Sequence, residues 1–157
     1  MNKRHQQQAF IRFFRQQTGE SEVDMHKVAD FALARGWPQP KPHTARDLLA
    51  SEFSAAAREE IRQDAKTGRP YRANHAYPVR QGDGQQFLWV DIDEATRPQM
   101  HRSITNRREQ IVGDVVQLTL DVDHWNRINA AHEPLDVATD FTPDLEWRMN
   151  GPDEVGA

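Results

Sequence analysis

The chain has no cysteine and no long apolar run, and each absence excludes a class of protein. Without cysteine, its 157 residues can form no disulfide, thiolate nucleophile or cysteine-based zinc site. No apolar stretch approaches the ~20 residues that a membrane-spanning helix needs, and the N-terminal segment has no signal-peptide pattern. A P-loop, a GxSxG motif and a dinucleotide-binding fingerprint are also missing. We expect a cytoplasmic protein that is not an enzyme and has no cofactor.

Charge is unevenly distributed along the chain. Residues 1–72 carry 13 Lys and Arg against 9 Asp and Glu, a net charge of +4. Residues 73–157 carry 7 against 15, a net charge of −8. A basic half joined to an acidic half favours an anionic partner for the first. Ordinary surface charge that maintains solubility is the alternative.

Two amphipathic helices are expected near the N-terminus. The first runs from about Gln7 to Gln17, because three phenylalanines of that segment fall on one helical face. The second runs from Asp24, a suitable N-cap, to about Arg35, where Gly36 follows in the position of a C-terminal glycine.

A third helix and a hairpin are expected next. The proline-rich stretch 37–43 is an extended connector, after which Thr44 can cap a helix that reaches about Asp64. Residues 71–79 and 85–92 are predicted strands, and the two glycines between them indicate a hairpin.

Residues 95–128 fit two patterns. Their apolar residues recur every three or four positions from Met100 to Trp125, as in a long helix. Residues 115–123 also alternate as a strand would, and Gly113 costs a helix about 1 kcal/mol. The helical pattern covers more positions, so a helix is predicted. Its apolar stripe is long for so small a domain, and a symmetric homodimer would bury the remainder.

The order of three helices and a hairpin is that of a winged helix-turn-helix domain, in which the third helix and a basic wing contact DNA. The predicted fold is α+β and mostly helical: a winged helix (1–92), a long dimerisation helix (93–128) and an acidic segment (129–157). Cations and short polar groups suit contacts with the phosphates of double-stranded DNA. The candidate DNA-binding residues are Lys41, His43, Thr44 and Arg46 in the third helix and its approach, and Lys66, Arg69, Arg72, Asn74 and His75 in the wing.

Other constellations carry weaker hypotheses. The histidines show no metal-binding spacing, so no metal site is predicted. Asp91 and Asp93, or Asp121, could hold magnesium in a nuclease, although a D-x-D pair after a strand is also a common helix cap. Arg97, Arg102, Arg107 and Arg108 could extend a DNA-binding face or form a solvated helix face. Residues 135–147 either dock on the protein's own body or bind a protein partner.

Four segments resemble an uncharacterised family of small bacterial proteins. They are TGRPYRANHA (67–76), FLWVDID (87–93), NRREQIVGD (106–114) and TDFTPDLE (139–146). The resemblance covers nearly all of the chain from residue 23 onward and implies a bacterial source. Residues 1–92 resemble winged-helix transcription regulators at the level of fold only. A third helix that is long and poor in base-reading Asn and Gln departs from that pattern.

The leading hypothesis is a dimeric DNA-binding regulator, or an accessory factor of a nucleic-acid system. The alternative is a protein–protein adaptor that uses the winged helix as a scaffold and the acidic segment for docking, because winged helices also serve protein contacts.

Overall fold

The computed structural model describes residues 2–82 and 84–152. These residues form five helices and two small antiparallel sheets, so the predicted α+β, mostly helical class is confirmed. Contacts divide the chain into two compact units, with the boundary between Ser51 and Glu52. The predicted division at residues 92 and 128 stays a prediction.

The first unit contains helices α1 (Lys3–Thr18) and α2 (Met25–Ala34), and α1 extends beyond its predicted bounds at both ends. Asp24 is the N-cap of α2, as predicted, and its carboxylate accepts a hydrogen bond of 2.8 Å from the backbone N–H of His26. That N–H lowers the pKa of Asp24. Gly36 follows α2 with a φ of 77°, the left-handed conformation that favours glycine.

Aromatic side chains form the core of the first unit. Phe14 is only 3% exposed, and its ring centroid lies 5.2 Å from that of Phe31 on α2. Phe10 contacts Trp37 with a centroid distance of 4.9 Å, so the segment after α2 closes onto α1. Val28 and Ala32 are buried beside them. The apolar faces expected from sequence are therefore the faces that meet.

Helix α3 (Ala45–Glu59) is capped by Thr44, whose hydroxyl accepts a hydrogen bond of 3.1 Å from the backbone N–H of Asp47. The prediction that this helix reaches Asp64 is wrong. Residues 61–63 form strand β1 (Ile61–Gln63), which pairs with β2 (Pro70–Arg72) around a tight turn. The carboxylate of Asp64 accepts two backbone N–H groups in that turn, and this lowers its pKa and stabilises the reversal.

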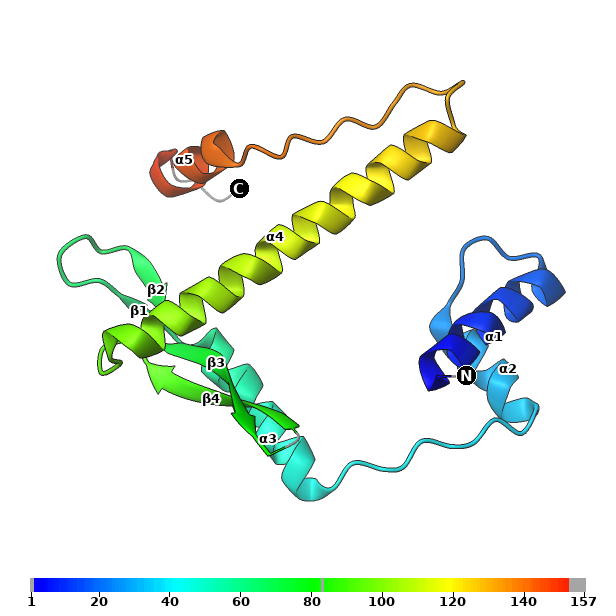
Figure 1. Cartoon of the computed structure of the whole chain (residues 1–157), viewed down its shortest axis with the longest axis horizontal. Coiled ribbons are helices and arrows are strands. Elements are labelled where there is room, and N and C mark those ends of the chain that lie inside the picture. Colours follow the sequence, from blue (N-terminus) through cyan, green and yellow to red (C-terminus); the bar gives the residue numbers. More distant parts are fainter. Residues whose placement is uncertain (1, 83, 153–157) are drawn as a thin grey trace. The chain divides into compact units, whose positions relative to one another are not determined.

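The predicted hairpin is confirmed as β3 (Asn74–Gln81) and β4 (Gly84–Asp91) (Figure 1). Its register places Asn74 opposite Asp91. The predicted strand 71–79 is divided at Ala73, which is fully buried between β2 and β3. The N–H of Ala73 donates to the carbonyl of Glu60, and its carbonyl accepts from Ile92. These bonds join the end of α3 to both strands of the hairpin.

Helix α4 (Arg97–Ile128) is one unbroken helix that includes residues 115–123, so the prediction of a long helix rather than a strand is confirmed (Figure 1). The Gln99 side chain accepts a hydrogen bond of 2.9 Å from the backbone N–H of Thr96 at its start. Its first turns pack on β3, where the buried Ser103 hydroxyl donates to the carbonyl of Ala76 at 2.9 Å. Most of the apolar stripe beyond that point is exposed, including Ile104, Ile111, Leu118 and Trp125.

After α4 the chain turns back and continues to helix α5 (Thr142–Asn150). The side chain of Asn126 bonds to both backbone groups of Leu135: its amide nitrogen donates to the carbonyl at 2.9 Å, and its oxygen accepts from the N–H at 2.8 Å. This pair fastens the returning segment to the last turns of α4. None of the helices in the described part of the chain is both long and apolar enough to cross a membrane.

Candidate nucleic-acid interface

A groove of about 450 Å³ lies between α3, the β3–β4 hairpin and α4. Its wall residues are basic, polar and aromatic in character: Ser54, Arg58, Arg72, Asn74, His75, Ala76, Phe87, Trp89, Ser103, Asn106, Arg107 and Gln110. On α4 the groove is lined by Ser103, Asn106, Arg107 and Gln110, which fall on one helical face because they are three, four and seven residues apart.

Three arginines from different elements converge on this groove. Arg58 comes from the end of α3, Arg72 from the end of β2 and Arg107 from α4, about one turn after Ser103. All three are exposed, and among the described residues that line the groove none is a carboxylate. The side chains that line the groove therefore carry net positive charge in a chain whose net charge is −4, while the carboxylate of Glu60, 2.8 Å from the Asn74 amide, is paired with Arg62.

Two aromatic rings accompany the arginines. Phe87 and Trp89 are two residues apart on β4, so they lie on the same face of the hairpin. Phe87 is 49% exposed, and Trp89 is half-buried opposite the small side chain of Ala76. The guanidinium carbon of Arg58 lies 5.4 Å from the centroid of the Trp89 ring, which is within the range of a cation–π attraction.

Hydrogen bonds from Asn74 hold α3 against the hairpin. Its amide nitrogen donates to the carbonyl of Ala57 at 3.2 Å and to the carboxylate of Glu60 at 2.8 Å. Arg58 is adjacent to Ala57 in the chain, so the same contact fixes the position from which Arg58 reaches Trp89. Asn74 thus positions the groove wall in addition to lining it.

A second polar cluster lies at the same end of the hairpin as Asn74, around Arg62 on β1. Its guanidinium donates two hydrogen bonds to Asp91, at 2.8 and 2.7 Å, and one to Asp93 at 2.8 Å. Asp93 also accepts a hydrogen bond of 3.0 Å from the Tyr71 hydroxyl, which raises the pKa of Tyr71. The Arg62 bonds lower the pKa of Asp91 and raise that of Arg62.

This cluster bears on the magnesium hypothesis for Asp91 and Asp93. Their oxygens are occupied by an arginine, whose positive charge opposes binding of a cation at the same place. No group of three or more His, Asp or Glu side chains in the described ranges could hold a metal ion. The chemistry of the cluster is that of a structural ion pair.

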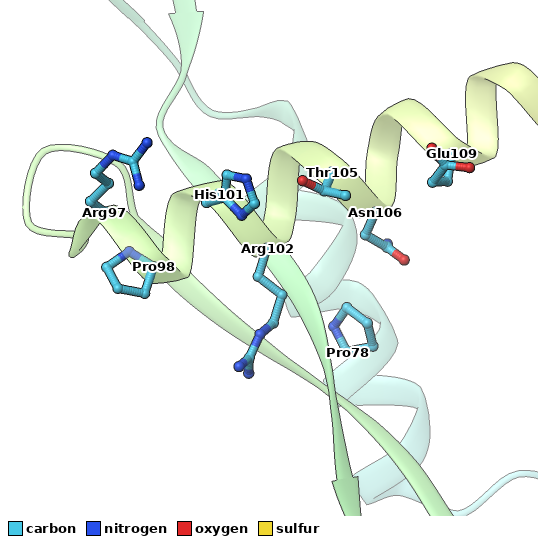
Figure 2. Close-up of a pocket in the computed structure, with 8 residues that line it drawn as sticks. All are labelled: Pro78, Arg97, Pro98, His101, Arg102, Thr105, Asn106 and Glu109. Carbon is cyan, nitrogen blue, oxygen red and sulfur yellow. The ribbon is translucent and has the colours of Figure 1, made fainter.

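A shallower hollow lies beside the groove, between β3 and the first turns of α4 (Figure 2). Figure 2 shows Arg102 and Asn106 on the side of α4 where Pro78 lies. The guanidinium of Arg102 lies 5.7 Å from the centroid of the Tyr77 ring. Asn106 lines both the hollow and the groove, so the two surfaces are continuous. The hollow adds the cations Arg97 and Arg102, together with one carboxylate, Glu109.

The structure brings three of the candidate DNA-binding residues together in the groove: Arg72, Asn74 and His75. Lys66 and Arg69 lie in the turn between β1 and β2, and Arg69 donates a hydrogen bond of 2.7 Å to Asn150 of α5. Four others belong to the first unit, where all are exposed: Lys41, His43, Thr44 and Arg46. Their contact with DNA stays a prediction.

The sequence alone did not single out Arg58 and Trp89. Arg58 is one of many charges on a predicted helix, and Trp89 is expected in the core. Arg58 and Trp89 are identified by their proximity in the folded structure, because their partners in the groove lie on other elements. A usable hint is the F-L-W spacing of residues 87–89, which places two aromatic rings on one face of a strand.

No protein-family model matches the chain, and no curated protein or solved structure matches it either.

Proposed function

We propose that this protein binds the phosphate backbone of nucleic acid. The proposed binding surface is the groove between α3, the hairpin and α4. The observation that carries the proposal is the convergence of Arg58, Arg72 and Arg107 on one concave surface with no carboxylate among its described lining residues. Arginine pairs with phosphate through two parallel hydrogen bonds. Such cations supply the sequence-independent part of nucleic-acid affinity.

The proposed role is binding without catalysis, as a regulator or an accessory factor. The carboxylates that a nuclease would use at the hairpin end are paired with Arg62. The finer proposal is that α1, α2, α3 and the hairpin form a winged helix, with Lys41, His43, Thr44 and Arg46 on the same duplex. It is supported by the order of these elements along the chain.

A salt-dependent binding assay tests the function. Fluorescence anisotropy is measured with a labelled 20-base-pair duplex and a labelled 20-nucleotide strand at 50 and 200 mM salt. With about three phosphates neutralised, affinity is expected to fall roughly 20- to 40-fold between these concentrations. Arg72→Gln and Arg107→Gln should weaken binding and reduce the salt slope, whereas Arg148→Gln on α5 should change neither. Absence of binding to either probe at 50 mM salt contradicts the proposal.

We also propose that the active form is a homodimer joined through α4. Four apolar residues of α4 recur every seven positions, as in one position of a coiled-coil heptad: Ile104, Ile111, Leu118 and Trp125. Their side chains are between 37% and 58% exposed. Arg97, Arg102, Arg107 and Arg108 lie in the N-terminal half of α4, and Asp114, Asp121 and Asp123 in the C-terminal half. Antiparallel pairing of two copies would place opposite charges together. Light scattering that gives a monomer mass at every concentration contradicts the dimer.

An adaptor function is the second candidate, because α5 presents exposed apolar side chains. Leu145, Trp147 and Met149 are between 58% and 66% exposed, and aromatic and methionine side chains are enriched at protein interfaces. The test is a pull-down with the full chain after nuclease treatment. A partner that persists after nuclease and is lost on deletion of residues 135–157 supports the adaptor.

A further inference from the structure

We infer that the groove accepts single-stranded nucleic acid, with unpaired bases stacked on Trp89 and Phe87. This inference rests on the proposed nucleic-acid binding and specifies the class of ligand. It comes from the aromatic part of the groove, which phosphate contacts alone do not explain.

The two rings are placed as a stacking platform. Residues two apart on a strand are separated by about 6.8 Å, so Phe87 and Trp89 can each receive one of two neighbouring bases. Across the hairpin they face Pro78 and Ala76, and neither partner has a long side chain that would cover a ring. Phe87 is 49% exposed, so its ring is accessible to a ligand.

The surrounding polar groups match the rest of a nucleotide. Arg58 lies over Trp89 at 5.4 Å and is exposed, so its guanidinium can swing aside when a base stacks on the ring and then pair with the adjoining phosphate. Asn106 and Gln110 offer amide groups at the α4 wall of the groove. Side-chain amides can donate to and accept from base edges.

A double helix cannot use this platform in the same way. Its bases are stacked on one another and show only their edges in the grooves, whereas the faces of Trp89 and Phe87 need a base whose own face is free. The groove volume of about 450 Å³ is in the range of small-molecule sites, about 300–1,000 Å³. It therefore suits individual nucleotides of a flexible strand. A duplex could reach only the arginines at the rim.

The experiment compares labelled dT20, labelled rU20 and a labelled 20-base-pair duplex by anisotropy at 50 mM salt, using the full chain. We expect at least one single strand to bind tenfold or more tightly than the duplex, and the two strands distinguish DNA from RNA. Trp89→Leu should weaken single-strand binding about tenfold and leave duplex binding within about twofold. Trp147→Leu is the matched control, because Trp147 is 66% exposed on α5 and outside the groove.

Two further variants keep the test decisive if Trp89→Leu unfolds. Trp89→Phe retains a stacking ring and should keep most of the single-strand affinity, while Phe87→Leu removes the more exposed ring and should reduce it. Equal or tighter binding of the duplex, or unchanged single-strand affinity in folded Phe87→Leu and Trp89→Leu, overturns the inference but leaves nucleic-acid binding in place. Failure of all three probes to bind at 50 mM salt overturns the proposed function itself.

Discussion

The hydroxyl of Ser103 donates a hydrogen bond of 2.9 Å to the carbonyl oxygen of Ala76, and so fixes α4 on the hairpin. Ser103 is only 4% exposed, although nearly all other residues of α4 are more accessible. The groove lies on one side of this contact, and Asn106, one turn further along α4, lines both the groove and the hollow of Figure 2. The position of α4 therefore determines whether Arg107 faces Arg58 and Arg72 across the groove.

Replacing Ser103 should loosen this contact. Ser103→Ala removes one buried hydrogen bond, and we expect the free energy of unfolding to fall by about 1 kcal/mol. Urea denaturation followed by circular dichroism measures the change. Thr105→Ala, an exposed position two residues away on the same helix, should stay within about 0.5 kcal/mol of the wild type. A Ser103→Ala variant as stable as Thr105→Ala would show that the bond does not hold α4 in place.

The ion pair of Arg62 and Asp91 should make stability depend on acidic pH. Asp91 has its pKa lowered from 3.8 by the hydrogen bonds from Arg62 and the N–H of Asp93. The folded state therefore binds the proton less tightly than the unfolded state, and the pair contributes stability above pH 3.8. That contribution is lost as the pH falls through the lower pKa of the folded state.

Asp91→Asn removes the titrating group at this place. We expect a lower melting temperature at pH 7 and a smaller loss of stability between pH 5 and pH 3 than in the wild type. Thermal melts at a series of pH values measure both effects. Asp144→Asn, an exposed carboxylate on α5, is the control and should retain the wild-type slope. An unchanged slope in Asp91→Asn would contradict the role given to this pair.

Gly113 should lower the stability of α4 relative to alanine at the same position. It lies inside the helix, and an added Cβ would meet no atom within 4 Å. Gly113→Ala should therefore stabilise the protein by about 0.5–1 kcal/mol, because alanine loses less backbone entropy on folding and has the higher helix propensity. Denaturant midpoints measure the gain. A loss of stability would indicate that another molecule packs closely against residue 113.

Particular residues show which features of the fold the sequence can predict and which it cannot. The caps at Asp24 and Thr44 and the long period of α4 are local signals. The two caps correctly predicted where α2 and α3 begin, and the period correctly predicted a helix for α4. Strand β1 has only three residues, too few to show a period, so the third helix was predicted to continue through it. Two partners of Arg62, Asp91 and Asp93, lie 29 and 31 residues away, and no local pattern indicates them.

The residues of the groove also divide into those that local sequence patterns indicate and those that only contacts between distant residues reveal. Arg72 and His75 were predicted as binding residues from the hairpin alone. Arg58 and Trp89 acquire a role only because the Asn74 bonds bring the end of α3 against the hairpin, a contact between residues 17 positions apart. Hydrophobic periodicity specifies which face of an element is buried. It does not specify which element covers that face.

The aromatic core of the first unit offers a stability test that is independent of the groove. Phe14 is 3% exposed and its ring meets that of Phe31 edge-on, so Phe14→Ala removes a large buried side chain. We expect a loss of about 3 kcal/mol or more. Phe13→Ala, one residue earlier and 39% exposed, should cost clearly less. Equal losses for the two variants would contradict the burial that distinguishes these neighbours.

The exposed stripe on α4 gives the last prediction. Ile111 is 51% exposed in the middle of the helix, and an antiparallel pair of copies would bury it at the centre of their contact. Ile111→Glu should therefore convert a dimer into a monomer in light scattering, because a carboxylate buried there without a partner is strongly unfavourable. Arg148→Glu on α5 adds a negative charge away from α4 and should leave the mass unchanged. If Ile111→Glu retains the dimer mass, the two copies associate through another surface.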